Sequence, residues 1–240
     1  MEGAETWNDD ELIAVLLSRE VRDREVCGCG AHSMLPAAAL LLAQALHAPE
    51  ITPIILGSKA FMPFKTSRQF HFLAQRGDLG LFFVSGVQID QAGNYNLHQL
   101  GPVGSPLKRR FPGGYGGGMI YYTARRTVIF RTEHTRRTFV PEVDFISAAG
   151  ATPPEVMRHG NPTKVVTPLA TLAFDVAASR MVLESVHAGH TLEEVREHTG
   201  FDLGVGIKAP DTPPPSEEEL HTLRTVVRST MIHTDTYPDW

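Results

Sequence analysis

Cysteine is scarce in this sequence and confined to one place. The two cysteines, Cys27 and Cys29, are separated by a single residue, and at that spacing an extended chain does not easily reach normal disulfide geometry. We therefore predict two free thiols that pack at the end of a strand. A metal site is a weaker alternative, because no second Cys or His pair at zinc-like spacing follows. A nucleophilic thiol is a similarly weak alternative.

Excess basic charge and long apolar runs are also lacking. The formal net charge of -5 and the pI near 6.1 argue against tight, non-specific nucleic-acid binding and leave room only for a local basic groove. The longest apolar run, residues 35–46, is about half of the ~20 residues that span a bilayer, so we expect a buried helix and no membrane partner. The first five residues lack the basic and apolar regions of a secretory signal, which predicts a cytoplasmic protein.

The 240 residues, 42% of them hydrophobic, are enough for one large domain spanning residues 1–240. Helical periodicity is found at 9–22, 35–46, 65–76, 191–198 and 217–231, the fourth opening with a Thr191–Glu194 capping box and the fifth capped by Ser216. Short apolar runs lie at 25–30, 51–56, 79–84, 127–130 and 164–167. Such runs, connected by helices and glycine-rich loops, are typical of buried parallel strands, so we predict a three-layer α/β sheet. The proline-rich segment 208–216 is expected to be an extended connector.

Three segments carry residues suited to chemistry. Residues 85–96, S-G-V-Q-I-D-Q-A-G-N-Y-N, follow a predicted strand, and in α/β folds ligands lie at the carboxyl ends of strands. The alternative is a β-turn whose Asp and Asn side chains form hydrogen bonds with their own backbone, and the residues alone favour this alternative. Residues 111–119, F-P-G-G-Y-G-G-G-M, could expose N–H groups to an oxyanion or phosphate, or form a flexible loop. Residues 125–144 hold Arg131, His134, Arg136 and Arg137, which suit an anionic group or, more commonly, a solvated or subunit-facing charge cluster.

Taken together, these segments resemble the β subunits of family I CoA-transferases, notably the glutaconate CoA-transferase type. G-V-Q-I-D-Q-A-G-N-Y-N, the glycine loop, A-R-R-T-V-I-F, T-R-R-T-F-V-P-E-V-D-F-I-S-A-A-G and H-A-G-H-T-L-E-E-V-R-E-H-T-G-F-D-L are similar to that family's segments in the same order. The resemblance implies a Rossmann-like CoA-transferase fold. It also implies an α-type subunit that shares the active site in a heterodimer or heterotetramer. The substrate would be an acyl-CoA, with coenzyme A as part of the substrate and no tightly bound cofactor.

One departure from the family concerns the reaction. In the family, the strand after an Ala-Pro pair leads into a glutamate that attacks the thioester. Here Ala48-Pro49 leads through Ile54-Ile55 into Leu56-Gly57-Ser58-Lys59, and no carboxylate follows. Relatives without this glutamate include a hydrolase of a steroid-derived CoA ester, whose essential glutamate comes from the α chain. They also include a decarboxylase with a cysteine near the lost position, where this chain has none.

The resemblance therefore favours C–C bond hydrolysis or a related lyase step on an acyl-CoA, with the acid or base supplied by the partner. It implies that the glycine loop stabilises an enolate or oxyanion, that four polar residues shape the pocket, and that Ser58 and Lys59 contact substrate. The loop residues are Gly113, Gly114, Tyr115, Gly116, Gly117 and Gly118, and the four polar residues are Gln88, Asp90, Asn94 and Asn96. One alternative is CoA transfer through a nucleophile from elsewhere. The other is a non-catalytic structural subunit.

Overall fold

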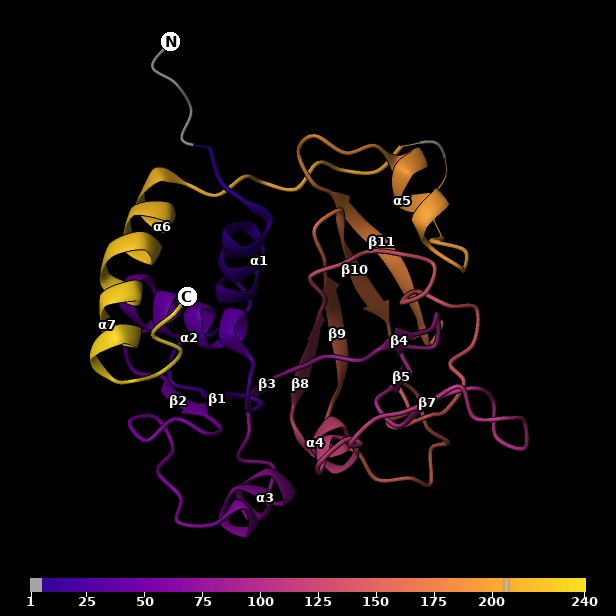
Figure 1. The fold of residues 1–240 in the computed structure, drawn as a ribbon, viewed down its shortest axis with the longest axis horizontal. Helices are drawn as coiled ribbons and strands as arrows, with labels where there is room; N and C mark the ends of the chain where they lie inside the picture. Colours follow the sequence, from indigo (N-terminus) through magenta and orange to yellow (C-terminus); the bar gives the residue numbers. More distant parts are fainter. Residues whose placement is uncertain (1–5, 205, 207) are drawn as a thin grey trace.

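A seven-stranded sheet forms the centre of the computed structural model, which describes residues 6–204, 206 and 208–240 (Figure 1). Five strands run parallel in the order β2-β1-β3-β8-β9, and β10 and β11 extend the sheet as an antiparallel pair. The strands are β1 (Val26–Cys29), β2 (Thr52–Ile55), β3 (Leu81–Val84), β8 (Arg126–Phe130), β9 (Asn161–Val166), β10 (Ala170–Asp175) and β11 (Arg180–Val186). The predicted α/β class is confirmed.

Alternation along the parallel strands divides the core into two faces. Because successive side chains of a strand point to opposite faces, Leu81 and Phe83 pack on one side of the sheet while Phe82 and Val84 pack on the other. The first side is covered by α1 (Asp9–Ser18) and α2 (Met34–Leu46), the helices predicted from the apolar run and the acidic first turn. A further layer, formed by α6 (Glu217–Thr222), η1 (Leu223–Val227) and α7 (Arg228–His233), packs on α1 and α2 through Leu223, Val227 and Met231.

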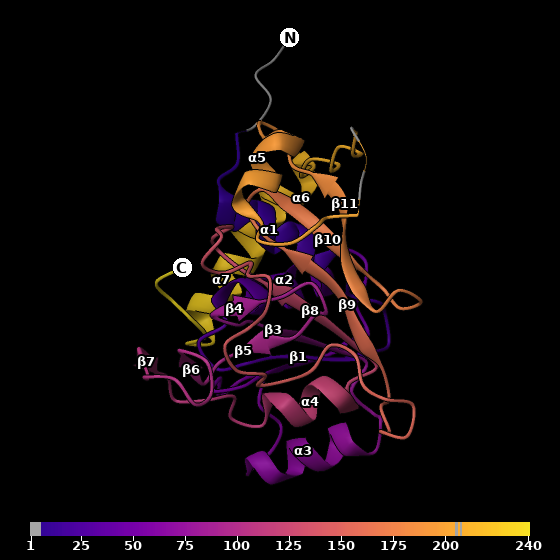
Figure 2. The same ribbon diagram turned by 90° about the vertical axis from the view of Figure 1, so that its right-hand side faces the viewer.

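The opposite side of the sheet carries short elements. They are α3 (Ser67–Gln75), α4 (Gly117–Thr123), α5 (Leu192–His198), and the two-stranded ribbons β4 (Gln88–Ile89) with β5 (Tyr95–Asn96) and β6 (Gln99–Leu100) with β7 (Arg109–Arg110). In Figure 1 the terminal helices lie at the left, the sheet at the centre and the ribbons at the right. Figure 2 shows α3 and α4 together at one end of the molecule. None of the helices in this described part of the chain is both long and apolar enough to cross a bilayer.

Several predicted elements are present, with differences in detail: the helix predicted at 9–22 ends at Ser18, and α4 was not predicted. Ser216 forms a complete capping box with Glu219 at the start of α6, as the cap prediction required. At α5 only half of the predicted box forms: the Thr191 hydroxyl accepts from the Glu194 N–H, while the Glu194 carboxylate binds His190 instead, at 3.0 Å. The hairpin β10–β11 was not predicted from the sequence. The proline-rich connector 208–216 crosses one end of the molecule to reach α6, as Figure 1 shows.

Candidate functional site

A cavity of about 530 Å³ opens at the carboxyl ends of β1, β2 and β3. The residues that follow each strand line it: Gly30 and Ala31 after β1, Leu56 and Gly57 after β2, and Ser85 after β3. From β1 the chain proceeds to β2 on one side, and β3 lies on the other side. The cavity therefore occupies the point where the strand order reverses, which is where open α/β sheets bind their ligands.

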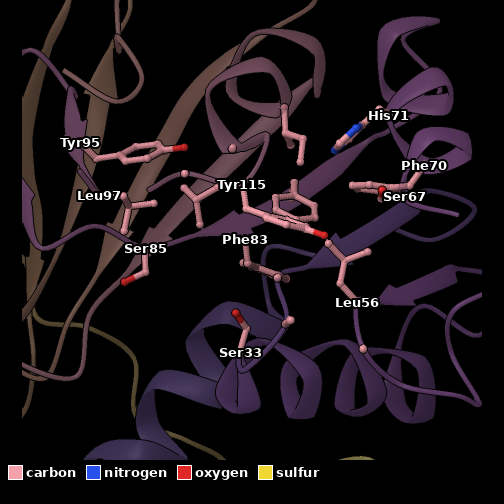
Figure 3. Close-up of a pocket in the computed structure, with 18 of the residues that line it drawn as sticks. Ser33, Leu56, Ser67, Phe70, His71, Phe83, Ser85, Tyr95, Leu97 and Tyr115 are labelled. Atoms are coloured by element: carbon pink, nitrogen blue, oxygen red, sulfur yellow. The ribbon is translucent and has the colours of Figure 1, made fainter. Parts of the chain in front are cut away.

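The wall of this cavity is mostly apolar (Figure 3). Its apolar side chains come from the strand ends, from α3 and α4, and from the segments between them: Leu56, Met62, Phe70, Phe82, Phe83, Val84, Leu97 and Ile120. Its polar side chains are those of Ser33, Ser67, His71, Ser85, Tyr95 and Tyr115. Among the described residues that line the cavity there is no Asp, Glu, Lys or Arg. The described part of the chain therefore brings no carboxylate and no permanent cation into this space.

The glycine-rich loop forms one side of the cavity through Gly114, Tyr115 and Gly117. Gly113 and Gly116 have φ values of 100° and 85°, a region that side-chain-bearing residues rarely adopt. Tyr115, at φ 44°, shares that region and is 86% exposed. A Cβ on Gly116 would lie 2.7 Å from His71 Nε2, and one on Gly117 would lie 2.8 Å from the Tyr95 hydroxyl. The backbone conformation favours glycine at Gly113 and Gly116, and a side chain at Gly116 or Gly117 would displace His71 or Tyr95.

Tyr95 is the most deeply buried of the polar residues that line the cavity. Its side chain is fully buried, it packs edge-on against the Tyr121 ring at 4.9 Å, and its hydroxyl finds no hydrogen-bond partner in the described part of the protein. Burial raises the pKa of this phenol, so the group remains a proton donor at neutral pH. Its backbone is fixed, because Tyr95 N donates to Ala148 O and its carbonyl accepts from Ser147 N. In Figure 3 the hydroxyl points from the ribbon toward the glycine loop.

The four polar residues predicted to shape the pocket are not among the residues that line the cavity, and they form hydrogen bonds in pairs. Asn96 Nδ2 donates to Gln88 Oε1 at 2.7 Å, and Gln88 Nε2 donates to Asp144 Oδ2 at 3.1 Å. Asp90 accepts from both the backbone and the side chain of Asn94, which closes the β-turn between β4 and β5. Burial raises the pKa of Asp90, and the hydrogen bonds from Asn94 oppose that rise. These contacts match the turn interpretation, while a pocket-shaping role stays a prediction.

Ser58 and Lys59 are not among the residues that line the cavity. The Ser58 side chain is buried, and its hydroxyl lies 2.7 Å from that of Thr236 in the C-terminal tail. Lys59 is exposed. The neighbouring Leu56 and Gly57 face the cavity in their place, so direct contact of Ser58 or Lys59 with a substrate stays a prediction.

The basic residues of segment 125–144 form structural contacts. Arg131 and Arg137 pair with Glu133, and Arg136 donates to Glu197 O. His134 is buried between the hydroxyls of Thr167 and Thr199, and burial lowers its pKa to about 3. A neutral, enclosed imidazole does not recognise an anion, so His134 is better explained by packing. Arg136 and Arg137 are exposed, as a solvated or subunit-facing charge cluster requires.

The two thiols are free and buried, as predicted. Burial raises the pKa of Cys27 to about 12 and raises that of Cys29 as well. Both thiols therefore stay protonated, which disfavours the nucleophilic alternative. Within the described residues, no group of three or more His, Cys, Asp or Glu side chains is placed to hold a metal ion.

A model of the coenzyme A transferase family matches residues 63–198, which include the predicted ligand segment, the glycine loop and the basic segment. This chain belongs to the coenzyme A transferase family. Two relatives match along most of its length. The B subunit of 3-oxoadipate CoA-transferase from Pseudomonas knackmussii is 26% identical over 91% of this chain and 92% of the relative. The B subunit of glutaconate CoA-transferase from Acidaminococcus fermentans is 28% identical over 85% of this chain and 88% of the relative. The cholesterol ring-cleaving hydrolase IpdB subunit of Mycobacterium tuberculosis is 31% identical over 58% of this chain and 57% of the relative.

Solved structures agree on the fold. Glutaconate coenzyme A-transferase from Acidaminococcus fermentans superposes with a TM-score of 0.78 at 24% identity, covering 92% of this chain and 94% of that one. The decarboxylase AibA/AibB superposes with a TM-score of 0.77 at 22% identity, covering 90% and 93%. This CoA-transferase family chain therefore has the expected fold.

Sequence reasoning missed several cavity residues of this family member, above all Tyr95 and His71. Tyr95 stands between two polar side chains in a segment already singled out. Alternation along a strand indicates that its side chain faces the opposite side from its neighbours, but not which of the two sides faces a ligand.

Proposed function

We propose that this chain is the β-type subunit of a heteromeric enzyme that acts on an acyl-CoA thioester together with an α-type partner. We further propose that the enzyme hydrolyses a C–C bond, or performs a related lyase step, rather than transferring CoA. The relatives that support a heteromer are themselves named as single subunits of larger enzymes. Among them, the Mycobacterium tuberculosis relative is named for a ring-cleaving hydrolase. We expect the enzyme to act in the cytoplasm.

The observation that carries this proposal is a ligand-sized cavity whose described lining residues include no carboxylate. Transfer by the family's covalent route needs a carboxylate that attacks the thioester and then holds CoA as an acyl thioester. Leu56 and Gly57 face the cavity at the turn where that carboxylate would stand. A serine or tyrosine hydroxyl there has no neighbouring base among the lining residues except His71. The chain is thus better suited to binding and charge stabilisation than to nucleophilic attack.

The glycine loop would supply the charge stabilisation. In C–C hydrolysis of a 3-oxoacyl thioester, hydroxide adds to the ketone carbon, the bond to the α-carbon breaks, and its electron pair moves onto the thioester oxygen as an enolate. A proton then returns to the α-carbon. Fixed donors aimed at the developing oxyanion lower the barrier to such steps, and Gly114 and Gly117 bring backbone close to the cavity. The base that forms hydroxide would come from the partner.

The proposal is tested with the complex, co-expressed with the α-type chain of the same operon or locus. Purified complex is incubated with acyl-CoA and free carboxylic acids, treated with hydroxylamine or borohydride, and this chain is mapped by peptide mass spectrometry. We expect C–C cleavage products and no adduct on any residue of this chain. Efficient CoA exchange with a trapped adduct on this chain would refute the proposal.

CoA transfer through a nucleophile of the partner is the second candidate. It is favoured by the two relatives that match over most of the chain, since both are named CoA-transferases. In that case CoA exchange would be efficient and the trapped adduct would map to the partner chain. If neither acyl-CoA nor CoA binds to the complex in calorimetry, the chain is a structural subunit.

A further inference from the structure

The apolar cavity and the Tyr95 hydroxyl together indicate which acyl group this chain holds. We propose, on the basis of the proposed function, that the cavity takes an uncharged, apolar acyl group and that Tyr95 donates a hydrogen bond to an oxygen of that group. The proposal names a substrate class and a binding residue.

Charge is the first argument. A carboxylate transferred into an apolar site without a partner is costly, and the lining of this cavity holds no Lys or Arg among the described residues. Among the described lining side chains, His71 alone can become cationic on protonation. An acyl group that ends in a second carboxylate is therefore disfavoured, whereas aliphatic carbon would contact Leu56, Phe70 and Leu97.

The unpartnered hydroxyl is the second argument. Buried polar groups nearly always have a hydrogen-bond partner, and Tyr95 Oη has none in the described structure although its side chain is fully buried. Other buried polar atoms without a partner belong to Thr127, Arg131, Arg180 and Glu184, and none of these residues lines the cavity. A ligand oxygen that reaches Tyr95 Oη from the cavity would therefore supply the missing hydrogen-bond partner.

The position of the hydroxyl is the third argument. Gly117 lies so close that a Cβ there would be 2.8 Å from Tyr95 Oη, so the phenol and the glycine loop meet at one spot. An acyl oxygen at that spot would contact both the donor and the loop proposed to stabilise it. The rest of the acyl group would then extend along the apolar wall.

Tyr121 offers a matched control for the test. Its ring lies 4.9 Å from that of Tyr95 and it is equally buried, but its hydroxyl donates to Gly93 O at 2.8 Å and it does not line the cavity. Tyr121→Phe should lower the melting temperature and leave ligand binding unchanged. Tyr95→Phe removes a hydroxyl that has no partner within the described chain, so it should not lower the melting temperature.

The experiment is calorimetric titration of the co-purified complex at pH 8, where imidazole groups supply little positive charge. The probes are CoA, glutaryl-CoA and 5-methylhexanoyl-CoA, the last replacing the terminal carboxylate of the second with an isopropyl group. We expect 5-methylhexanoyl-CoA to bind at least about tenfold more tightly than glutaryl-CoA, since the cavity desolvates the acyl group without pairing its charge. Tyr95→Phe should weaken 5-methylhexanoyl-CoA about three- to tenfold, as expected for one lost hydrogen bond, and leave CoA unchanged.

Two results would overturn the inference while leaving the proposed function intact: glutaryl-CoA binding as tightly as its apolar analogue, or Tyr95→Phe binding both acyl-CoAs like the wild type. A complex that binds neither acyl-CoA nor CoA would instead remove the proposed function, and the inference with it.

Discussion

The hydroxyl pair of Ser58 and Thr236 gives a quantitative test of what replaced the family's glutamate turn. Both side chains are buried, at 6% and 2% exposure, and their oxygens lie 2.7 Å apart. Ser58 Oγ also accepts from Phe61 N at 3.2 Å. Removing the Ser58 hydroxyl takes the acceptor from Phe61 N and one contact from Thr236, which keeps its contact with Thr234 at 3.0 Å. The loss of a buried hydrogen-bond partner costs about 1–3 kcal/mol. We therefore expect a loss of about 2 kcal/mol for Ser58→Ala and somewhat less for Thr236→Val.

Removing both hydroxyls should cost less than the sum of the single losses, because the Ser58–Thr236 hydrogen bond is then lost only once, whereas each single variant loses it separately. The double variant should recover about 1 kcal/mol of that sum, the coupling energy of a direct contact. For a chain of this size, 1 kcal/mol shifts the melting temperature by about 2–4 °C. The assay is thermal unfolding of the co-purified complex at one protein concentration, since association also shifts stability. Additive shifts in melting temperature would refute a direct contact. If Ser58→Ala leaves the stability of the complex unchanged but abolishes acyl-CoA binding, Ser58 contacts substrate instead.

Three further predictions follow from the structure. Gly116→Ala should impair acyl-CoA binding, because its Cβ would lie 2.7 Å from His71 Nε2 and would displace this cavity-lining side chain. Gly104→Ala is the control: its φ of 87° is similar, so the backbone strain of about 1 kcal/mol is the same, but no atom lies within 4 Å and binding should be normal. Equal effects of the two variants on the calorimetric affinity would contradict the loop's role. Burial lowers the pKa of His134 to about 3, so below about pH 6.5 the unfolded chain binds a proton that the folded chain does not. The free energy of unfolding should then fall from about pH 6.5 toward pH 3 by up to about 1.4 kcal/mol per pH unit. His134→Asn should reduce this pH dependence in urea titrations carried out at several pH values. An unchanged pH dependence would argue against a buried neutral ring. The two cysteines should resist thiol reagents in the native complex and react in denaturant, as measured by mass spectrometry of this chain's peptides; rapid native labelling would exclude protonated, enclosed thiols.

The parallel part of the sheet could be predicted because its strands are buried on both faces. Runs such as Leu81–Val84, with four buried residues in succession, show in the sequence as uninterrupted apolar stretches. The hairpin β10–β11 was not predicted, because one of its faces is only partly covered. Ser185, Glu184 and Arg180 interrupt the apolar pattern of β11, and an alternating strand of this kind gives a weaker signal than a continuous run.

The candidate site was predictable in outline only. The glycine loop and the end of β3 do line the cavity, as ligand-binding segments should. The sequence pattern did not tell which polar side chains of residues 85–96 face inward. Amides and carboxylates are short and satisfy turns and loops locally, so Asp90 and Asn94 bind each other while the longer Tyr95 side chain reaches the cavity.

The C-terminal tail holds two turns beside the cavity through contacts that no local sequence pattern indicates. Tyr237 Oη accepts a hydrogen bond from Ser33 N, in the turn that follows β1, while Thr236 binds Ser58 in the turn that follows β2. Two adjacent residues, about 200 positions distant from Ser33, therefore fix both strand-end turns that border the cavity. Where a catalytic carboxylate would need freedom to attack and release an acyl group, this chain has a buried hydroxyl held by its own terminus. That difference in physical chemistry, more than the missing side chain alone, favours a subunit that holds its substrate rather than one that carries CoA.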